Sequence, residues 1–293
     1  MGRTVHRVLQ GEGERSRWHL ATLPEDLDIR SPDLARHVAD QRPDAVLHLG
    51  ALTSVSESFR EPERFFDVNF NGTWNLLRAL RSMAFAGRLL FVSSGDCYGA
   101  VADADLPVRE TQPLRPRSPY AVSKVAAESL CYQWSQTEHL DVVLARSFNH
   151  LGPGQDIRFA VPWFAKQVAK IRNGSAPPRI LAGDLDVTRD LTDVRDVVLA
   201  YLALIEKGRM GEAYNVGSGR EVRLRDVLDE LLSIAGVTAD VVTDAARVRS
   251  AEQRRAVADV RKIAADTGWS ARTPLSRTLG DMLDDWSRRS HLE

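Results

Sequence analysis

The sequence predicts an α/β protein with a doubly wound parallel sheet and a smaller, mainly helical C-terminal lobe. Two observations lead to this prediction: from about residue 44 short apolar runs alternate with long helical periods, and after Ser147 that spacing loosens. Short buried strands separated by long helices are typical of a parallel sheet with crossover helices. We therefore expect a sheet domain over residues 1–147 and a second lobe over residues 148–293, some segments of which return to the sheet.

The predicted elements follow one another without a repeat or a low-complexity linker. In the first domain we expect a strand in "DAVLHLGA", a helix in "EPERFFDVNFNGTWNLLRALRSM", a strand in "GRLLFVSS", a helix in "YAVSKVAAESLCYQWSQT" and a strand in "LDVVLARS". In the second lobe we expect a helix around residues 160–173, the strand "RILAG", a helix with Asp193 as its N-cap, and helices around residues 222–235, 259–267 and 275–289. A cleft between the lobes is the expected ligand site.

Composition narrows the class of protein and its partners. The formal net charge is -1, which gives no general footprint for nucleic acid, and no apolar run approaches the roughly 18 residues that cross a bilayer. Two cysteines, Cys97 and Cys131, exclude a disulfide scaffold, and because no long apolar stretch follows the first basic residues we expect no secretory signal. We expect a cytoplasmic protein without a metal site, whose partner is a small molecule.

The stretch "SPYAVSK", residues 118–124, places Tyr120 and Lys124 one turn apart on a helix. A phenol has a pKa near 10, which is too high for a base at neutral pH, and a nearby ammonium lowers it. Such a pair suits a carbonyl–alcohol interconversion, in which one proton moves as a hydride moves. Such a pair alone more often lies on a solvated helix face than in a catalytic site.

The stretch "FVSSGDCYG", residues 91–99, ends an apolar strand in hydroxyl residues. Active sites of open parallel sheets lie outside the carboxyl ends of the strands, where Ser93 and Ser94 fall. Ser94 is therefore a candidate to hold the oxygen that Tyr120 protonates. A polar strand end that bonds its own backbone is the simpler alternative.

Together these motifs resemble a known family. "SSGDCYG", "SPYAVSK", "ARSFNHLGPGQ", "GDLDVTRDLTDV", "YNVGSG" and "RVRSAEQRR" occur in the order seen in the extended short-chain dehydrogenases/reductases that act on nucleotide sugars, over roughly residues 26–289. Within that family they are most similar to the branch that reduces GDP-4-keto-6-deoxy sugars. The resemblance implies a Rossmann cofactor domain, NADP or NAD as cofactor, a GDP-sugar substrate and a homodimer.

The resemblance also assigns the catalytic residues. It makes Tyr120 the proton donor to the sugar C4 oxygen, Lys124 the group that lowers its pKa, and Ser94 the catalytic hydroxyl. Related 4,6-dehydratases carry a glutamate two residues after that Ser/Thr, where this chain has Asp96. A carboxylate withdrawn by about 1.5 Å transfers protons poorly, because a misplacement near 1 Å can cost about 10²-fold. We therefore expect ketone reduction, with GDP-D-rhamnose as product, rather than dehydration.

The binding residues follow from the same resemblance. The implied cofactor contacts are Asp28, Ile29, Leu49, Gly50, Ala51, Thr53, Tyr120, Lys124 and His150. The implied substrate contacts are Ser94, Asp96, Asn149, Arg189, Arg249 and Glu252, of which Arg189 would meet the diphosphate through its guanidinium. The family's dimer helices correspond to residues 62–83 and 120–138, where Trp74, Leu77 and Trp134 are candidates for the interface.

The chain departs from the family at its beginning. The family opens with a strand, a Gly-x-x-Gly-x-x-Gly turn and a helix whose N-terminus receives the cofactor pyrophosphate. The first 25 residues offer only "GEG", so we expect the first strand–helix unit to be missing. Two alternatives therefore stay open beside the reductase: a GDP-mannose 4,6-dehydratase, and a catalytically silent nucleotide-sugar-binding protein.

Overall fold

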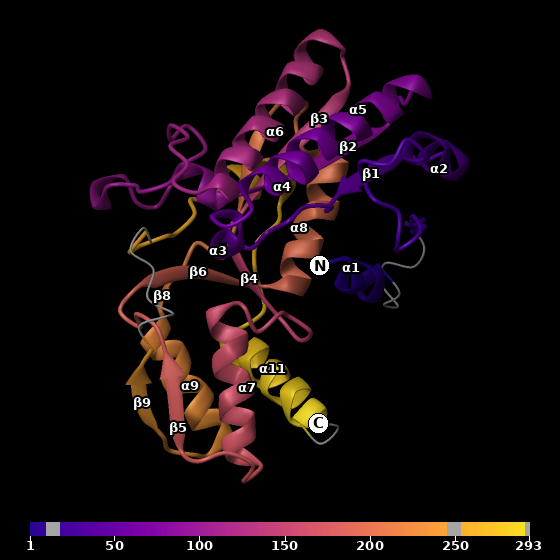
Figure 1. Cartoon of the computed structure of the whole chain (residues 1–293). Coiled ribbons are helices and arrows are strands. Elements are labelled where there is room, and N and C mark those ends of the chain that lie inside the picture. The colour runs from indigo at the N-terminus through magenta and orange to yellow at the C-terminus, as the bar shows by residue number, and fades with distance from the viewer. Residues whose placement is uncertain (10–17, 245–252, 291–293) are drawn as a thin grey trace.

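The structure, a computed structural model, describes residues 1–9, 18–244 and 253–290. Its main sheet has four parallel strands in the order β1 (Ala45–His48), β2 (Arg88–Ser94), β3 (Asp141–Ser147) and β7 (Ala213–Val216). Helices cover both faces of this sheet (Figure 1). The predicted α/β class with a parallel sheet is thus confirmed.

Side chains alternate between the two faces along each strand. On β2, Leu89 and Phe91 join the cluster under α5 (Gly72–Ser82) and α6 (Pro119–Thr137), while Leu90 joins the cluster under α8 (Val194–Lys207). The strands are apolar on both faces, as expected for a sheet buried between two helical layers. This sandwich brings the carboxyl ends of β1, β2 and β3 to one edge.

The predicted helix over residues 61–83 is a chain of three pieces. α4 (Pro62–Phe66) passes into a π-helical turn, η1 (Asp67–Asn71), and then into α5; the short α3 (Val55–Ser58) precedes them and α2 (Leu34–Gln41) packs beside α5. Asn69 lies in the π-helical turn and is buried. π-Helical turns inside α-helices are rare and occur often at functional sites.

The second lobe has its own core. Its elements are β4 (Asn149–Leu151), α7 (Ala160–Arg172), β5 (Arg179–Ala182), β6 (Thr188–Asp193), β8 (Glu221–Arg223), α9 (Leu224–Ala235), β9 (Asp240–Thr243) and α11 (Leu275–Ser290). β6 lies between β4 and β8, and β5 pairs with β9. Asp193 caps α8 as predicted, since its carboxylate accepts the Arg195 amide hydrogen at 2.7 Å. α8 and α10 (Arg261–Thr267) lie against the main sheet, of which β7 is the last strand.

The N-terminal residues differ from the expectation. Gly2–Leu9 form a helix, α1, whose Val5 and Leu9 pack against Val198 and Leu202 of α8. A helix therefore precedes β1 on the α8 side of the sheet, so the described residues do not show the loss of a whole strand–helix unit. The sequence pattern missed α1 because only two of its residues are buried apolar contacts.

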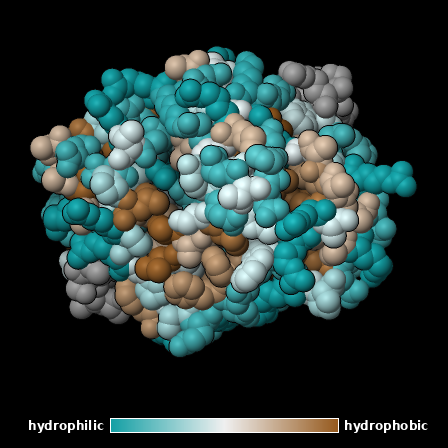
Figure 2. Space-filling view, turned by 90° about the horizontal axis from the view of Figure 1, so that it is seen from above, coloured by the Kyte–Doolittle hydropathy of each residue, from teal (hydrophilic) through white to brown (hydrophobic). Residues whose placement is uncertain are grey.

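Hydrophobic side chains remain exposed on the α5–α6 side. Figure 2 views the molecule from that side and shows hydrophobic groups gathered near the middle of the face. The exposed large apolar residues of α3 to α6 are Phe59 at the end of α3, Phe66 of α4, Trp74 of α5, and Val122 and Tyr132 of α6. Of the three interface candidates, Trp74 is 48% exposed, whereas Leu77 and Trp134 are core residues and are not available for an interface. No helix in the described part of the chain is long and apolar enough to span a membrane.

A buried ion pair joins α6 to β3. The Glu128 carboxylate accepts hydrogen bonds from Arg146 Nε at 3.0 Å and Nη2 at 2.6 Å, and both side chains are almost fully buried. Arg146 also donates to the Tyr98 hydroxyl at 3.0 Å and to the Glu110 carbonyl at 2.9 Å. The pair therefore fixes the helix that carries Tyr120 and Lys124 against the sheet.

Replacing one partner of this pair is expected to destabilise the fold strongly. Arg146→Met leaves the Glu128 carboxylate buried without a partner, which costs about 3–5 kcal/mol of unfolding free energy. Urea unfolding measures the loss. The control is Arg81→Met, which removes the exposed Arg81–Glu138 pair and costs about 0–1 kcal/mol. Equal losses in both variants would contradict the role assigned to the buried pair.

Candidate active site

The centre of the site is a pair of hydroxyls at the carboxyl end of β2. Ser94 ends β2 and its hydroxyl accepts the Asp96 amide hydrogen at 3.2 Å, which starts the 3-10 turn Gly95–Tyr98. Tyr120 lies in the first turn of α6, which begins with Ser118 as N-cap and Pro119. The two hydroxyls are hydrogen-bonded to each other. The structure thus brings together Ser94 and Tyr120, which are 26 residues apart in the sequence.

Burial controls the protonation of Tyr120. Its side chain is buried and meets the ring of Phe65 edge-on at 6.4 Å between centroids. Burial, and then the charge of Asp96, raise the pKa of Tyr120 far above its ordinary value, while the hydrogen bond with Ser94 lowers it in part. At neutral pH the phenol is protonated, which is the state that a proton donor requires.

Lys124 lies one turn further along the same helix and is buried. Its ammonium is 4.2 Å from the centroid of the Phe91 ring, a cation–π contact. Burial lowers the pKa of Lys124 to about 8, and the neighbouring Cys97, Cys131 and Glu128 oppose that shift. The amine is thus mainly charged at neutral pH. Because Tyr120 is so strongly buried, the lowering of its pKa by Lys124, expected from the sequence, is not among the effects that dominate here.

Asn69 connects this helix to the loop that follows β1. Its side-chain amide nitrogen donates to the Leu52 carbonyl at 3.1 Å and to the Ser123 hydroxyl at 2.9 Å. Its side-chain oxygen Oδ1 accepts the Leu52 amide hydrogen at 2.8 Å. Ser123 in turn donates to the Tyr120 carbonyl at 2.7 Å. The loop of Leu49, Gly50, Ala51 and Thr53 is therefore held in register with α6, the helix of Tyr120.

A second buried contact supports the same loop. His48, the last residue of β1, bonds through Nε2 to the Thr73 hydroxyl at 3.0 Å. Burial, and then the charge of Lys124, lower the pKa of His48 to about 3, so the ring is neutral. His48 and Asn69 were not among the predicted binding residues. For Asn69 the family resemblance implies a mainly structural helix asparagine, and for His48 the signal is its place at the end of a predicted strand.

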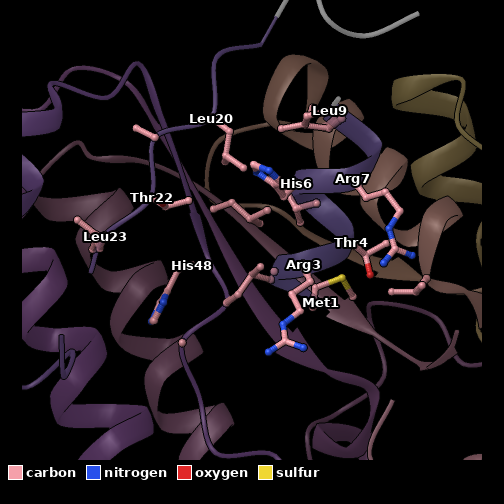
Figure 3. Close-up of a pocket in the computed structure, with 18 of the residues that line it drawn as sticks. Met1, Arg3, Thr4, His6, Arg7, Leu9, Leu20, Thr22, Leu23 and His48 are labelled. Atoms are coloured by element: carbon pink, nitrogen blue, oxygen red, sulfur yellow. The ribbon is translucent and has the colours of Figure 1, made fainter. Parts of the chain in front are cut away.

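A large cavity of about 1980 Å³ opens beside β1. Leu49, Gly50, Ile29 and His150 line it together with the first residues of α1 (Figure 3). The Nδ1 atom of His150 is buried and has no hydrogen-bond partner in the described part of the chain, and burial lowers the pKa of this ring to about 4. A long cavity with an unsatisfied buried nitrogen fits a bound cofactor that supplies polar groups.

Asp28 is exposed and forms an ion pair with Arg30. Arg30 donates to its carboxylate through the backbone amide at 2.8 Å and through Nε at 2.9 Å, and the same guanidinium also bonds Asp67. This arrangement lowers the pKa of Asp28 to about 2, through the side-chain bond of Arg30 first. Ile29 next to it does line the cavity.

The structure describes three of the five predicted substrate residues other than Ser94. Asp96 is exposed on the turn after β2, and Asn149 is exposed on β4, which pairs with β6 through Leu191. Arg189 lies two residues before Leu191, and its guanidinium donates to the Thr188 carbonyl at 2.7 Å. Arg249 and Glu252 lie outside the described residues. Among the residues that the structure describes, no group of His, Cys, Asp or Glu side chains could hold a metal ion.

This geometry suits proton transfer to a substrate oxygen. The Ser94 and Tyr120 hydroxyls lie together, and the Tyr120 phenol is protonated. The Lys124 ammonium lies one helical turn away, where such a charge can stabilise the phenolate that proton transfer leaves. These groups lie at the carboxyl end of β2, and ligands of open α/β sheets bind at the carboxyl ends of the strands. The class of protein is thus an oxidoreductase of the doubly wound type.

Comparison with known proteins gives the family. The family model described as GDP-mannose 4,6 dehydratase matches residues 11–282. The chain belongs to the NAD-dependent epimerase/dehydratase family of extended short-chain dehydrogenases/reductases, and it is an enzyme of the NAD(P)-dependent nucleotide-sugar oxidoreductase kind.

Individual relatives cover most of the chain. GDP-6-deoxy-D-mannose reductase from Pseudomonas aeruginosa is 44% identical over 272 residues, which are 93% of this chain and 90% of that protein. dTDP-glucose 4,6-dehydratase from Streptomyces antibioticus is 34% identical over 84% of this chain and 70% of that protein. Among solved structures, RMD from Pseudomonas aeruginosa complexed with NADPH has a TM-score of 0.92 at 42% identity, covering 98% of this chain and 94% of that one.

The buried Lys124 is expected to make stability depend on pH. Between its folded pKa of about 8 and its ordinary value of 10.5 the unfolded chain binds more protons, so the unfolding free energy rises with pH. The gain is complete above 10.5 and is lost as the pH falls through 8. From pH 7 to pH 9 it amounts to about 1 kcal/mol.

Urea unfolding of the wild type and of Lys124→Met at both pH values measures this gain. Lys124→Met should lose it, whereas Lys207→Met, which changes an exposed lysine, should keep it. A Lys124→Met variant with the same pH dependence as the wild type would show that Lys124 is not desolvated.

Proposed function

We propose that this enzyme reduces the C4 ketone of GDP-4-keto-6-deoxy-D-mannose to GDP-D-rhamnose with NADPH or NADH. The observation that carries the proposal is the buried, protonated Tyr120 hydrogen-bonded to Ser94, one turn before Lys124. The likeness to GDP-6-deoxy-D-mannose reductase supports the choice of substrate. The structure of RMD with NADPH supports the choice of cofactor.

In this proposal the chain's own residues handle the proton. The Ser94 hydroxyl orients the ketone oxygen toward Tyr120, and Tyr120 donates its proton to that oxygen. The Lys124 ammonium stabilises the resulting phenolate until solvent restores the proton. The nicotinamide, when bound, supplies the hydride for C4.

Cofactor and substrate contacts are proposed from the cavity and from the family pattern. Leu49, Gly50, Ile29 and His150 would hold the dinucleotide, since all four line the cavity beside β1. Ala51 and Thr53 belong to the same loop, which Asn69 fixes. Asp28 would contact the adenine only if Arg30 released its carboxylate. Asp96, Asn149, Arg189, Arg249 and Glu252 remain the proposed contacts of the GDP-sugar.

Dehydration is the alternative reaction. A dehydratase of this family needs a carboxylate that reaches the C5 proton, and Asp96 is one methylene shorter than glutamate. In the structure Asp96 is exposed and acts on Tyr120 through its charge. Consumption of GDP-mannose without added reductant would favour the dehydratase. Binding of a GDP-sugar with neither reaction would favour a silent binding protein.

The catalytic prediction concerns the Tyr120 hydroxyl. Tyr120→Phe removes the proton donor without changing the ring that packs on Phe65, so kcat for NADPH oxidation by the ketosugar should fall about 10²–10⁴-fold. NADPH binding, measured by calorimetry, should stay within about threefold. Tyr132→Phe, an exposed position on the same helix, is the matched control and should keep its kcat. An active Tyr120→Phe variant would reject the proposed donor.

We also propose that the enzyme is a cytoplasmic homodimer. The exposed Trp74, Val122 and Tyr132 lie on α5 and α6, and an apolar patch of this kind commonly marks an interaction site. Both cysteines are free and buried, as suits a reducing compartment.

The dimer prediction concerns Trp74. Trp74→Asp puts a charge into the proposed interface and should give a monomer in sedimentation equilibrium, whereas the wild type should be a dimer. Leu181→Asp, which changes an exposed apolar residue on β5 of the second lobe, should leave the dimer intact. A monomeric wild type would contradict the proposed homodimer.

A further inference from the structure

Gly95 follows Ser94 at the start of the turn after β2, and the structure leaves no room there for a side chain. A Cβ atom added to Gly95 would lie 3.1 Å from Cδ2 and Cε2 of Phe148 and 3.2 Å from its Cγ. Ordinary contact between carbon atoms begins at about 3.5 Å. The backbone of Gly95 does not take the left-handed conformation that favours glycine. The Phe148 ring, rather than the backbone, therefore limits this position to glycine.

The Phe148 ring is held in place on several sides. The residue follows β3 directly, and its amide donates to the Val216 carbonyl of β7 at 2.8 Å. The ring is buried and packs on the ring of Tyr98 at 6.3 Å between centroids. Next to it in the chain, the Ser147 hydroxyl is hydrogen-bonded to the Tyr201 hydroxyl of α8 at 2.7 Å. The ring therefore has little freedom to move away from the turn.

The two ends of the turn differ in how they are held. The far end is fixed by the Tyr98 hydroxyl, which donates to Asn215 at 2.6 Å and accepts from Arg146 at 3.0 Å. The near end is coupled to the Ser94 hydroxyl, because that oxygen accepts the Asp96 amide hydrogen at 3.2 Å. A displacement of the turn therefore falls on its first residues and moves the Ser94 hydroxyl.

We propose that Phe148 is a positioning residue for the reaction: by packing against Gly95 it sets the place of the Ser94 hydroxyl beside Tyr120. This inference rests on the proposed function, in which Ser94 orients the ketone oxygen. A contact as short as that at Gly95 must be relieved by a shift of a few tenths of an ångström. A misplacement near 1 Å can cost about 10²-fold in rate, so we expect this shift to cost about three- to tenfold.

Gly95→Ala tests the contact, because it adds the one atom that meets Phe148. With NADPH and the ketosugar, kcat should fall about three- to tenfold. NADPH binding, measured by calorimetry, should stay within about twofold, since neither residue lines the cavity beside β1. The matched control is Gly280→Ala on α11, where an added Cβ meets nothing within 4 Å and kcat should not change. An unchanged kcat in Gly95→Ala would overturn the proposal.

The role of Phe148 is tested by making room for the added atom. Phe148→Leu keeps most of the apolar volume, and Phe148→Ala removes all three contacting ring atoms at a larger cost in Tm. In either background Gly95→Ala should lower kcat by less than about twofold, because the contact is gone. Phe164→Leu, which changes a buried phenylalanine of α7, should leave the full effect of Gly95→Ala. An equal effect of Gly95→Ala in the wild-type and Phe148→Leu backgrounds would overturn the proposal.

A second measurement needs no turnover. In protein made with carbon-13-labelled tyrosine, the Cζ signal of Tyr120, assigned with Tyr120→Phe, reports its hydrogen bond with Ser94. Gly95→Ala should shift this signal in the wild type and leave it unshifted in the Phe148→Leu background. A wild type without reductase activity would contradict the proposed function, and this signal would then decide the packing inference alone. A signal that Gly95→Ala does not shift would overturn that inference.

Discussion

The ion pair between Glu128 and Arg146 is the contact on which the site depends. It ties α6 to β3, and through Arg146 it reaches Tyr98 and, from the Tyr98 hydroxyl, Asn215 of β7 at 2.6 Å. Two strands, the turn after β2 and the helix of Tyr120 thus share one buried polar network. Because its members are hydrogen-bonded to one another, small shifts of α6 along the sheet would leave charges unpaired. The position of the Tyr120 hydroxyl above Ser94 is fixed in this way.

The proton states at the site follow from burial more than from neighbouring charges. Tyr120, Lys124 and His48 are all shifted toward their neutral forms, with burial as the largest cause in each. The phenol is therefore protonated at neutral pH, and the amine keeps most of its charge there. The Phe91 ring contacts the Lys124 ammonium and the Phe65 ring contacts the Tyr120 ring, so both ionisable side chains pack on apolar groups.

Much of this arrangement could be predicted from the sequence, and the rest could not for definite reasons. The strands around Leu90 and Val143 and the N-cap at Asp193 follow from apolar runs and from cap chemistry, which are local signals. Tyr120 and Ser94 could be paired because both fall where a parallel sheet gathers its ligands. The bond between Asn69 and Leu52, the capture of Asp28 by Arg30 and the burial of Trp134 depend on tertiary contacts. The helix α1 is held by its packing on α8, which no local pattern reveals.

The π-helical turn at Asp67–Asn71 has a consequence for how this scaffold can change. A π-helical turn holds one residue more than the α-helical turn in its place, and each residue rotates the following helix by about 100°. Removing one residue here would restore regular α-helical bonding and make the segment intrinsically more stable. It would also turn Asn69 away from Leu52 and Ser123. The intrinsic stability of this helix and the fixed position of the loop after β1 therefore place opposite demands on this one turn.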